Sequence, residues 1–357
     1  MKYKALIALF LALTMLFTLA GCGGKEPPAP ETTTEAPPET AEPAPVQTDY
    51  RNPLTGESGY DEALLSQKGV AIVVENHPQA RPQWGFATPD IVMEYEVEGG
   101  ISRMLWLYAN IERVPDKVGP VRSARHDVVE LAQGEGLMFV HCGGSPQALN
   151  YIKTLGETYS EIDALTQTKY FPRDTSRGVS QEHTLTASQT GLKQAIGDLN
   201  VRMARDPEAG PLFDFAAAGE TVSPAGGDAK HLRIVYSGSY VYDFDYDAAS
   251  GKYAARLNDK GQTDENGVNT AYVNVLVLYT EMIDLGDTDH HQDLKLENGG
   301  AGLWLSGGKY QDITWRKTSA DAPLELFAAE GEPLTLNTGN SYIGFVRSTN
   351  AGKTVIN

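Results

Sequence analysis

The stretch Gly119-Pro120-Val121-Arg122-Ser123-Ala124-Arg125-His126 is the part of the chain around which the rest is organised. It gathers two arginines, a serine and a histidine in one short turn, flanked by apolar segments typical of strand and helix. A guanidinium group stays charged at physiological pH and offers a planar fork of donors that fits a phosphate or a carboxylate. We therefore predict that this segment, the arginine turn (residues 119–126), binds an anion.

Two interpretations of the arginines stay open at this point. A helix predicted over residues 123–133, with Gly134 as its stop, would add free backbone N–H groups and the positive end of its dipole to an anion site. In the alternative interpretation, the arginines stabilise the fold by pairing with carboxylates of a neighbouring strand, namely Glu94, Glu96 or Glu98.

Short apolar runs on both sides of the arginine turn predict strands at residues 70–74, 91–97, 103–111 and 137–141. Ser145-Pro146 is typical of a helix N-cap and its first turn, and a further helix is predicted over residues 187–199. Beyond about residue 231, short runs alternate with glycine turns and predict strands. The fold class is therefore mixed α/β or α+β, with a mixed sheet and helices in an N-terminal lobe and a β-rich C-terminal lobe.

Shifts in composition divide the 357 residues into successive parts. We expect a signal peptide with a lipobox, then a tether rich in Pro, Glu and Thr that is too polar to offset the entropy of ordering. An N-terminal α/β domain, a linker rich in Gly, Ala and Pro, and a C-terminal β-rich domain follow. The predicted boundaries are 1–22, 23–49, 50–205, 206–230 and 231–357.

The N-terminus predicts the compartment. A short basic region, Met1-Lys2-Tyr3-Lys4, precedes an apolar run over residues 5–20 that is too short for a comfortable membrane span. The run ends in Leu19-Ala20-Gly21-Cys22, which resembles a bacterial lipobox. We expect Cys22 to carry acyl chains such as palmitate and to anchor the protein at the extracellular face of the membrane. An ordinary signal peptide or membrane anchor is the alternative.

Composition and charge restrict the partners. The formal net charge of −18 argues against a nucleic-acid partner, which requires a basic face. We expect no cofactor and no metal, because no His-x-x-x-His or Cys pair supports the scattered histidines. The polar run over residues 287–293 is interpreted as a solvated loop. Cys142 has no partner for a disulfide if Cys22 is acylated.

The sequence favours recognition over catalysis. Cys142-Gly143-Gly144-Ser145 could present a nucleophile after a strand, but Pro146 and Gln147 follow, so the Gly-x-Ser-x-Gly elbow is absent. A structural turn with a capping serine is the simpler interpretation. Whether the protein is an enzyme stays undecided, and the sequence leans against it.

Three loops follow predicted strands, namely those over residues 75–85, 119–126 and 142–146. Ligands of α/β sheets gather outside the carboxyl ends of parallel strands, so we expect these loops to converge on one site. The predicted ligand-binding residues are Asn76, His77, Arg81, Asp90, Arg103, Arg122, Ser123, Arg125, His126, His141, Ser145 and His183.

Several segments, taken in order, resemble the YerB-like bacterial lipoprotein family, whose domain is described as of unknown function. They are Asn52-Pro53-Leu54-Thr55-Gly56, Glu75-Asn76-His77-Pro78, Glu98-Gly99-Gly100-Ile101-Ser102-Arg103, Gly119 to Arg125, Gly143 to Gln147, and Ile313-Thr314-Trp315-Arg316-Lys317. The resemblance covers about residues 50–350, with departures at Glu75 and Cys142. It implies a two-part lipoprotein on the outer face of the cytoplasmic membrane and supplies no catalytic residues.

A second likeness is to the plan of LytR-CpsA-Psr phosphotransferases, which hold a polyprenyl pyrophosphate with arginines. By that likeness Arg103, Arg122 and Arg125 would form the clamp, with Asp90 near a metal. The Arg-Asp pair of that family is not reproduced, because His126 follows Arg125.

The leading hypothesis is a lipid-anchored binding or interaction protein of the cell envelope. Its partner would be an envelope anion, a peptidoglycan fragment or an envelope protein. The alternative is a phosphotransferase-like enzyme acting on a lipid-linked glycan. Geometry separates the two interpretations of the arginines: convergence with Asp90 on one site favours a ligand, and pairing with glutamates favours a structural role.

Overall fold

The computed structural model describes residues 49–357. The signal peptide, Cys22 and residues 23–48 of the expected tether lie outside this range. Within it, no helix is long and apolar enough to cross a membrane.

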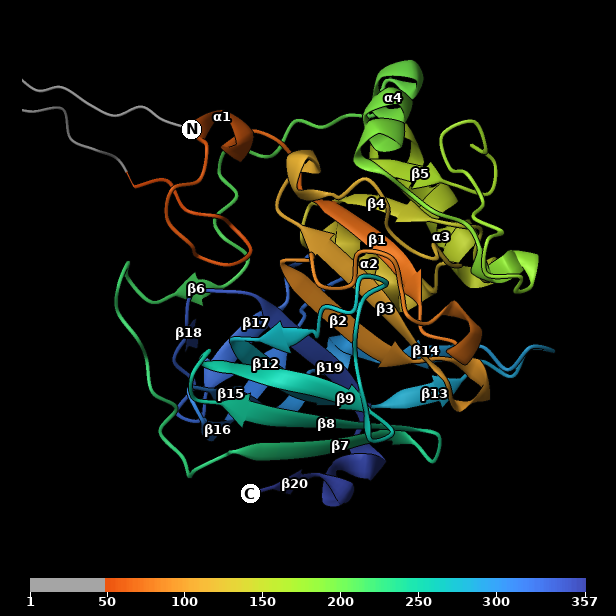
Figure 1. Cartoon of the computed structure of the whole chain (residues 1–357). Coiled ribbons are helices and arrows are strands. Elements are labelled where there is room, and N and C mark those ends of the chain that lie inside the picture. The colour runs from red at the N-terminus through yellow and green to blue at the C-terminus, as the bar shows by residue number, and fades with distance from the viewer. Residues whose placement is uncertain (1–48) are drawn as a thin grey trace, which may run out of the picture. The chain divides into compact units, whose positions relative to one another are not determined.

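A ten-stranded mixed sheet forms the centre of the molecule (Figure 1). Its order is β17 (Glu325–Ala328), β16 (Lys309–Arg316), β15 (Gly300–Ser306), β12 (Asn274–Thr280), β19 (Ser341–Arg347), β2 (Ile91–Glu96), β3 (Ser102–Tyr108), β1 (Val70–Glu75), β4 (Met138–His141) and β5 (Glu161–Asp163). The predicted mixed fold class is confirmed.

A second sheet packs on one face of the central sheet. Its order is β10 (Lys260–Gly261), β9 (Lys252–Leu257), β8 (Tyr240–Asp247), β7 (His231–Ser237) and β20 (Val355–Ile356), with β11 (Ala271–Tyr272) also paired to β9. Two small pairs complete the strands: β13 (Met282–Asp284) with β14 (Gln292–Leu294), and β6 (Asp214–Phe215) with β18 (Thr335–Leu336).

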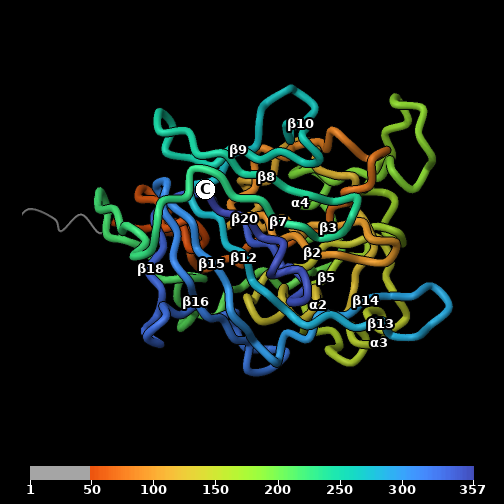
Figure 2. Tube along the Cα trace, turned by 90° about the horizontal axis from the view of Figure 1, so that it is seen from below, coloured from red at the N-terminus to blue at the C-terminus, as the bar shows by residue number. Residues whose placement is uncertain are grey.

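Helices α2 (His126–Gly134) and α3 (Pro146–Leu155) lie on the opposite face from β8 and β9 (Figure 2). The alternation along β1 explains both layers, because successive side chains of a strand point to opposite faces. Ala71 and Val73 pack with α2 and α3, whereas Ile72 and Val74 pack with the second sheet and α4 (Gln189–Leu199). A short helix, α1 (Glu62–Leu65), precedes β1.

The two halves of the chain share the central sheet. Strand β19 pairs in parallel with β2, in register from Ser341↔Ile91 to Phe345↔Tyr95, and residues 49–357 lie in one compact unit. The predicted linker over residues 206–230 contains β6, which pairs with β18. Whether the halves fold separately stays a prediction.

The predicted helix after the arginine turn begins later than expected. It starts at His126 instead of residue 123, with Arg125 as an N-cap in extended conformation (φ −120°, ψ 156°). The backbone N–H groups of Arg122 and Ala124 already donate to Val73 O (2.9 Å) and Gly143 O (2.9 Å). Residues 122–124 are therefore held as an extended segment, which excludes them from the helix.

Candidate functional site

The arginine turn passes between the ends of β1 and β4. These strands pair in parallel from Val70↔Met138 to Ile72↔Val140 and then separate. Arg122 fills the gap, because its N–H donates to Val73 O and its carbonyl accepts from Cys142 N (3.0 Å). Glu75 N and Trp84 N also donate to Pro120 O (3.0 Å) and Gly119 O (2.9 Å). The three loops therefore meet outside the carboxyl ends of two parallel strands.

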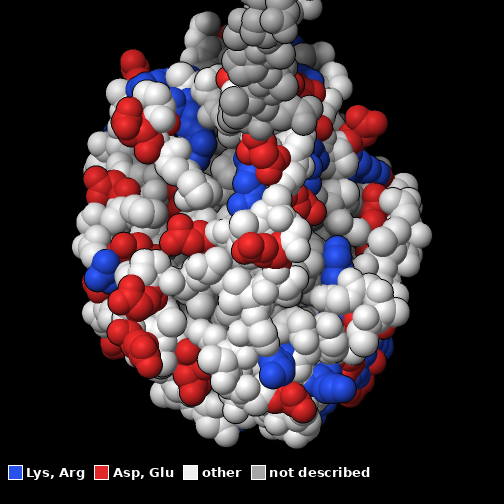
Figure 3. Space-filling model, turned by 90° about the vertical axis from the view of Figure 1, so that its left-hand side faces the viewer, with Lys and Arg blue, Asp and Glu red and all other residues white. Residues whose placement is uncertain are grey.

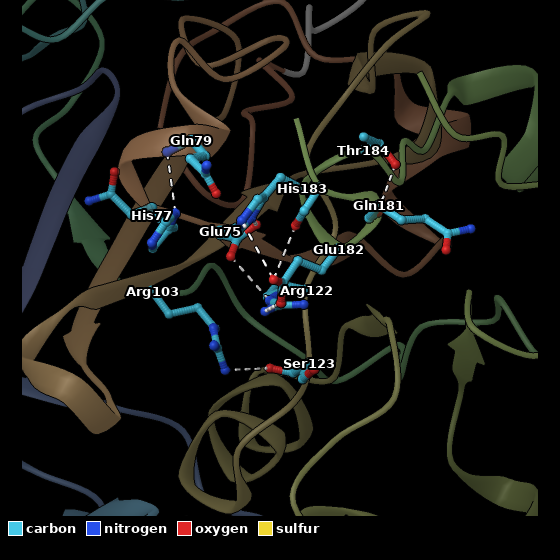
Figure 4. Close-up of polar contacts among 12 residues, drawn as sticks. Glu75, His77, Gln79, Arg103, Arg122, Ser123, Gln181, Glu182, His183 and Thr184 are labelled. Carbon is cyan, nitrogen blue, oxygen red and sulfur yellow. Dashed lines mark hydrogen bonds and ion pairs between the residues drawn. The ribbon is translucent and has the colours of Figure 1, made fainter. Parts of the chain in front are cut away.

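Arg122 bridges two glutamates of different exposure. Its Nε lies 3.1 Å from Glu75 Oε1, and its Nη2 lies 2.6 Å from Glu182 Oε2 (Figure 4). The Glu75 side chain is 2% exposed and the Glu182 side chain 53%, with Arg122 at 23%. Arg122 is thus fixed by a buried carboxylate on one side and by a surface carboxylate on the other.

Two histidines complete this group. His183 Nδ1 lies 2.8 Å from Glu75 Oε2, and the rings of His77 and His183 stack with their centroids 4.7 Å apart and 1° between their planes. Burial lowers the pKa of His77, and the neighbouring His183 lowers it further. His77 therefore favours its neutral form, which adds little positive charge to the group.

Arg103 and Arg125 share one carboxylate. Arg125 makes a two-pronged pair with Glu98, including Nε to Oε2 at 3.1 Å, and Arg103 Nη2 lies 3.8 Å from Glu98 Oε1. Arg103 Nη1 also donates to Ser123 O (3.0 Å; Figure 4). Both arginines are buried. Burial, together with the charge of Arg125, lowers the pKa of Arg103 to about 10.

The two groups adjoin each other, because Glu75 and Arg103 are opposite residues of β1 and β3. Within the described residues, no other carboxylate lies within 4.0 Å of Arg103 or Arg125. These two guanidinium groups therefore share a single carboxylate, whereas Arg122 in the adjoining group has two. Acidic and basic side chains are interspersed on the face seen in Figure 3, which lacks a broad basic surface.

Asp90 lies at the other end of the sheet. It precedes β2, whose Ile91 is level with Leu107, whereas Arg103 is level with Tyr95. Asp90 lies five residues before Tyr95, which corresponds to roughly 16 Å along the strand. Asp90 instead pairs with Arg113 (2.6 Å) and accepts from Asn52 and Ala109 N. The expected convergence of Asp90 with the arginines is therefore wrong, and the phosphotransferase-like clamp gains no support.

Asn76 and Arg81 face the second sheet. Asn76 Nδ2 donates to Glu94 Oε1 (3.0 Å), and Arg81 Nη2 donates to Tyr240 OH (3.2 Å). Glu94 also accepts from Ser102 and Tyr342, and complete burial raises its pKa to about 7. These residues form a polar contact between the sheets and do not bind Arg103, Arg122 or Arg125.

The remaining predicted residues have local partners. His141 is buried between Gly143 O (2.7 Å) and Glu161 Oε1 (2.6 Å). Ser145 caps α3 by accepting from Ala148 N (3.2 Å), as its position before Pro146 predicted. His126 faces Glu130 and Asp293, away from the arginines, at 3.5 Å from each.

Sequence reasoning named Glu98 as a possible partner of the arginines, and the structure places it there. It missed Glu75 and Glu182, and it named Glu94 and Glu96, which bind elsewhere. Only their positions in the sequence indicated these two glutamates as partners, because Glu75 ends a buried strand and Glu182 precedes His183. Among the described residues, no group of three or more His, Cys, Asp or Glu is arranged to hold a metal.

Comparisons with known proteins place these observations in a family. Residues 54–202 match the profile described as "Protein of unknown function (DUF3048) N-terminal domain", and residues 232–343 match its C-terminal domain. The "Putative lipoprotein YerB" of Bacillus subtilis (strain 168) is 29% identical over 305 residues, which is 84% of this chain and 87% of that protein. A crystal structure of the YerB protein from Bacillus subtilis matches with a TM-score of 0.74 and 26% identity, covering 86% of this chain and 99% of that one.

Proposed function

Because the chain belongs to the DUF3048 family, we propose that it is a lipid-anchored lipoprotein of the cell envelope that binds an anionic ligand at its arginine turn. The resemblance predicted from the sequence motifs is confirmed by the family matches. The lipobox-like sequence before Cys22 and the similarity to a lipoprotein support anchoring at the extracellular face.

The main support for the anion site is that Arg103 and Arg125 share one carboxylate, that of Glu98. Two buried guanidinium groups share one carboxylate in a region of low dielectric, so neither has a carboxylate partner of its own. The lowered pKa of Arg103 has the same cause. A phosphate or carboxylate would supply further acceptors to these donors, and guanidinium groups bind both in a bidentate manner.

Glu182 supports a site that is closed by the protein's own carboxylate. It lies on the hairpin joined by the Arg173↔Leu185 bridge and contacts Arg122 from the solvent side. A surface ion pair of this kind contributes little stability. A ligand anion would displace Glu182 from Arg122 while the buried Glu75 keeps the guanidinium in place.

The test is a thermal-shift titration of the purified full-length protein in detergent with two probes, inorganic phosphate and a muropeptide. A ligand of the native state stabilises by about 2.7 kcal/mol at a hundred times its Kd. We expect one probe to raise Tm, and Arg122→Gln to abolish the rise. Arg316→Gln, which changes an exposed arginine paired with Glu325, is the matched control. An unchanged response of Arg122→Gln would contradict the proposal.

A further inference from the structure

The solvent side of Arg122 is occupied by a carboxylate of the protein itself, that of Glu182. Its Oε2 lies 2.6 Å from Arg122 Nη2, and this hydrogen bond is the main cause that lowers the pKa of the Glu182 carboxyl group. The Glu182 side chain is 53% exposed, so it lies at the surface. The protein's own side chain thus shows which kind of group Arg122 binds at this position.

His183 faces the same two glutamates as Arg122. Its Nδ1 lies 2.8 Å from Glu75 Oε2, and its Nε2 lies 3.8 Å from Glu182 Oε1 (Figure 4). The second distance is too long for a hydrogen bond. Glu182 Oε1 accepts instead from Ser180 Oγ (3.2 Å). Nε2 therefore has no hydrogen-bond partner among the described residues, although the His183 side chain is only 4% exposed.

Glu182 thus pairs with Arg122 and leaves His183 Nε2 without a hydrogen bond. Glu182 and His183 belong to the same short helix, η5 (Gln181–His183), which restricts how the two side chains can meet. A carboxylate from outside this helix can place one oxygen on Arg122 Nη2 and the other on His183 Nε2, because both atoms lie within 3.8 Å of the Glu182 carboxylate. A protonated imidazole donates from both ring nitrogens, so Nδ1 keeps its contact with Glu75.

We propose that the ligand of the arginine turn is a carboxylate, bound by Arg122 and by the protonated imidazole of His183 after Glu182 has moved away. This inference rests on the anion site proposed above, and it adds His183 as a residue that selects the ligand. A peptide C-terminus and an acidic sugar both present this group.

A carboxylate fits the charges of the site better than a phosphate dianion. It replaces the single negative charge of Glu182 with another, whereas a dianion adds a second negative charge close to Glu75. Both oxygens of Glu75 already face Arg122 and His183, and the ring of His77 stacks on His183. Within the described part of the chain, no other basic group lies within 4.0 Å of Glu75 or Glu182 to offset the added charge.

Isothermal titration of the full-length protein in detergent at about pH 7 tests the ligand class. The probes are acetyl-alanyl-alanine, its C-terminal amide, glucuronate and glycerol phosphate, a monoester that is mainly a dianion at this pH. We expect at least one of the two carboxylates to bind with a Kd at or below about 1 mM, and glycerol phosphate to bind at least about tenfold more weakly. Binding of the peptide, with at least about tenfold weaker binding of its amide, identifies a peptide C-terminus, whereas binding of glucuronate alone identifies an acidic sugar.

Two outcomes of the titration would contradict the inference in different ways. Tighter binding of glycerol phosphate than of either carboxylate would overturn the carboxylate class and still support the anion site. Measurable but equal binding of the peptide and its amide, or binding of no probe, would contradict both the carboxylate class and the anion site.

Two substitutions at His183 test its role, because each replaces a different ring nitrogen. His183→Asn places an amide N–H near the position of Nδ1 and no atom at Nε2, whereas His183→Gln places an amide N–H near Nε2. We expect His183→Asn to weaken carboxylate binding at least about tenfold and His183→Gln to bind within about threefold of the native protein. His290→Gln, at a side chain that is 74% exposed, is the matched control.

The variants also separate the role of His183 from the anion site itself. Arg122→Gln should abolish the binding of every probe. Native affinity in His183→Asn, together with loss of binding in Arg122→Gln, would refute the role of His183 and keep the anion site. Equal losses in His183→Asn and His183→Gln would mean that His183 only supports the structure around Glu75. If His183→Asn does not fold, His183→Gln decides alone, because loss of carboxylate binding in that folded variant would refute the contact with Nε2.

Discussion

At the scale of single residues, carboxylates decide what the arginines do. The sequence identified Arg122 and Arg125 as unusual, because two guanidinium groups in one turn need anions nearby. Their partners come from 27 to 60 positions away along the chain. No local pattern encodes such pairings, so the sequence left the choice between a site and a structural pair open. The structure contains both, since each arginine is paired and Arg103 shares the carboxylate of Arg125.

Arg125→Ala should destabilise the protein by about 2 kcal/mol in urea unfolding. Removing one member of a fully buried pair costs roughly 3–5 kcal/mol, and the value is lower here because the Glu98 side chain is 25% exposed. Arg316→Ala, at an exposed pair with Glu325, should cost less than about 1 kcal/mol. Equal losses in the two variants would show that the Arg125–Glu98 pair adds no stability beyond a surface pair.

Glu94 should make stability fall as pH rises. Its folded pKa is raised to about 7 from an ordinary value of 4.5, so between these values the folded state binds more protons than the unfolded state. Stability is therefore greatest below about pH 4.5 for this group and decreases on the order of 3 kcal/mol by pH 7. Urea unfolding at pH 5 and pH 8 should show a smaller decrease in Glu94→Gln than in the native protein. The same decrease in both proteins would mean that Glu94 does not titrate in this range.

At the scale of elements, local patterns predicted the hairpin β2–β3, the strands β1 and β4, and the capped start of α3. Each depends on residues close together in the chain. The start of α2 was predicted three residues early, because the hydrogen bonds that extend residues 122–124 come from Val73 and Gly143. The polar run over residues 287–293 was interpreted as solvated. It ends in Asp293, which is buried against α2.

The hairpin that carries Glu182 gives the anion site its own prediction. Glu182→Gln removes the displaceable charge from Arg122 and keeps the size of the side chain, so a ligand anion no longer competes with it. We expect the Kd of the bound probe, measured by isothermal titration, to fall about three- to tenfold. Glu208→Gln, an exposed glutamate elsewhere, should leave the Kd unchanged. A weaker or unchanged affinity in Glu182→Gln would mean that Glu182 does not occupy the ligand's position.

At the scale of the whole molecule, the sequence indicated a change in the type of secondary structure but not the strand pairing that crosses it. The change from mixed α/β to mainly β near residue 231 agrees with the start of β7. The parallel pairing of β19 with β2 joins residues about 250 positions apart, and a parallel ladder leaves no turn signal in the sequence. The sequence therefore predicted the mixed N-terminal part and the β-rich C-terminal part, but not the sheet that runs through both.

Cys22→Ala should release the protein from the membrane fraction. Acylation supplies the anchor in our proposal, and the apolar run before Cys22 is too short for a comfortable span. Fractionation of cells, followed by detection of the protein in the soluble and membrane fractions, measures the effect. Ser145→Ala, a change far from the lipobox in sequence, is the control. Full retention of Cys22→Ala in the membrane would refute the lipid anchor.

The shared sheet predicts that neither half of the chain folds alone. A fragment of residues 231–357 would expose the edge of β19 and lose the packing of Ile343 and Phe345 against the rest of the core. Unpaired edges and uncovered apolar faces destabilise a sheet, so we expect no cooperative thermal unfolding from this fragment or from residues 49–230. Mixing the two fragments should restore a cooperative transition monitored by circular dichroism. A cooperative transition in either isolated fragment would instead establish the predicted domains as independent folding units, joined in the native protein only by the β2–β19 ladder.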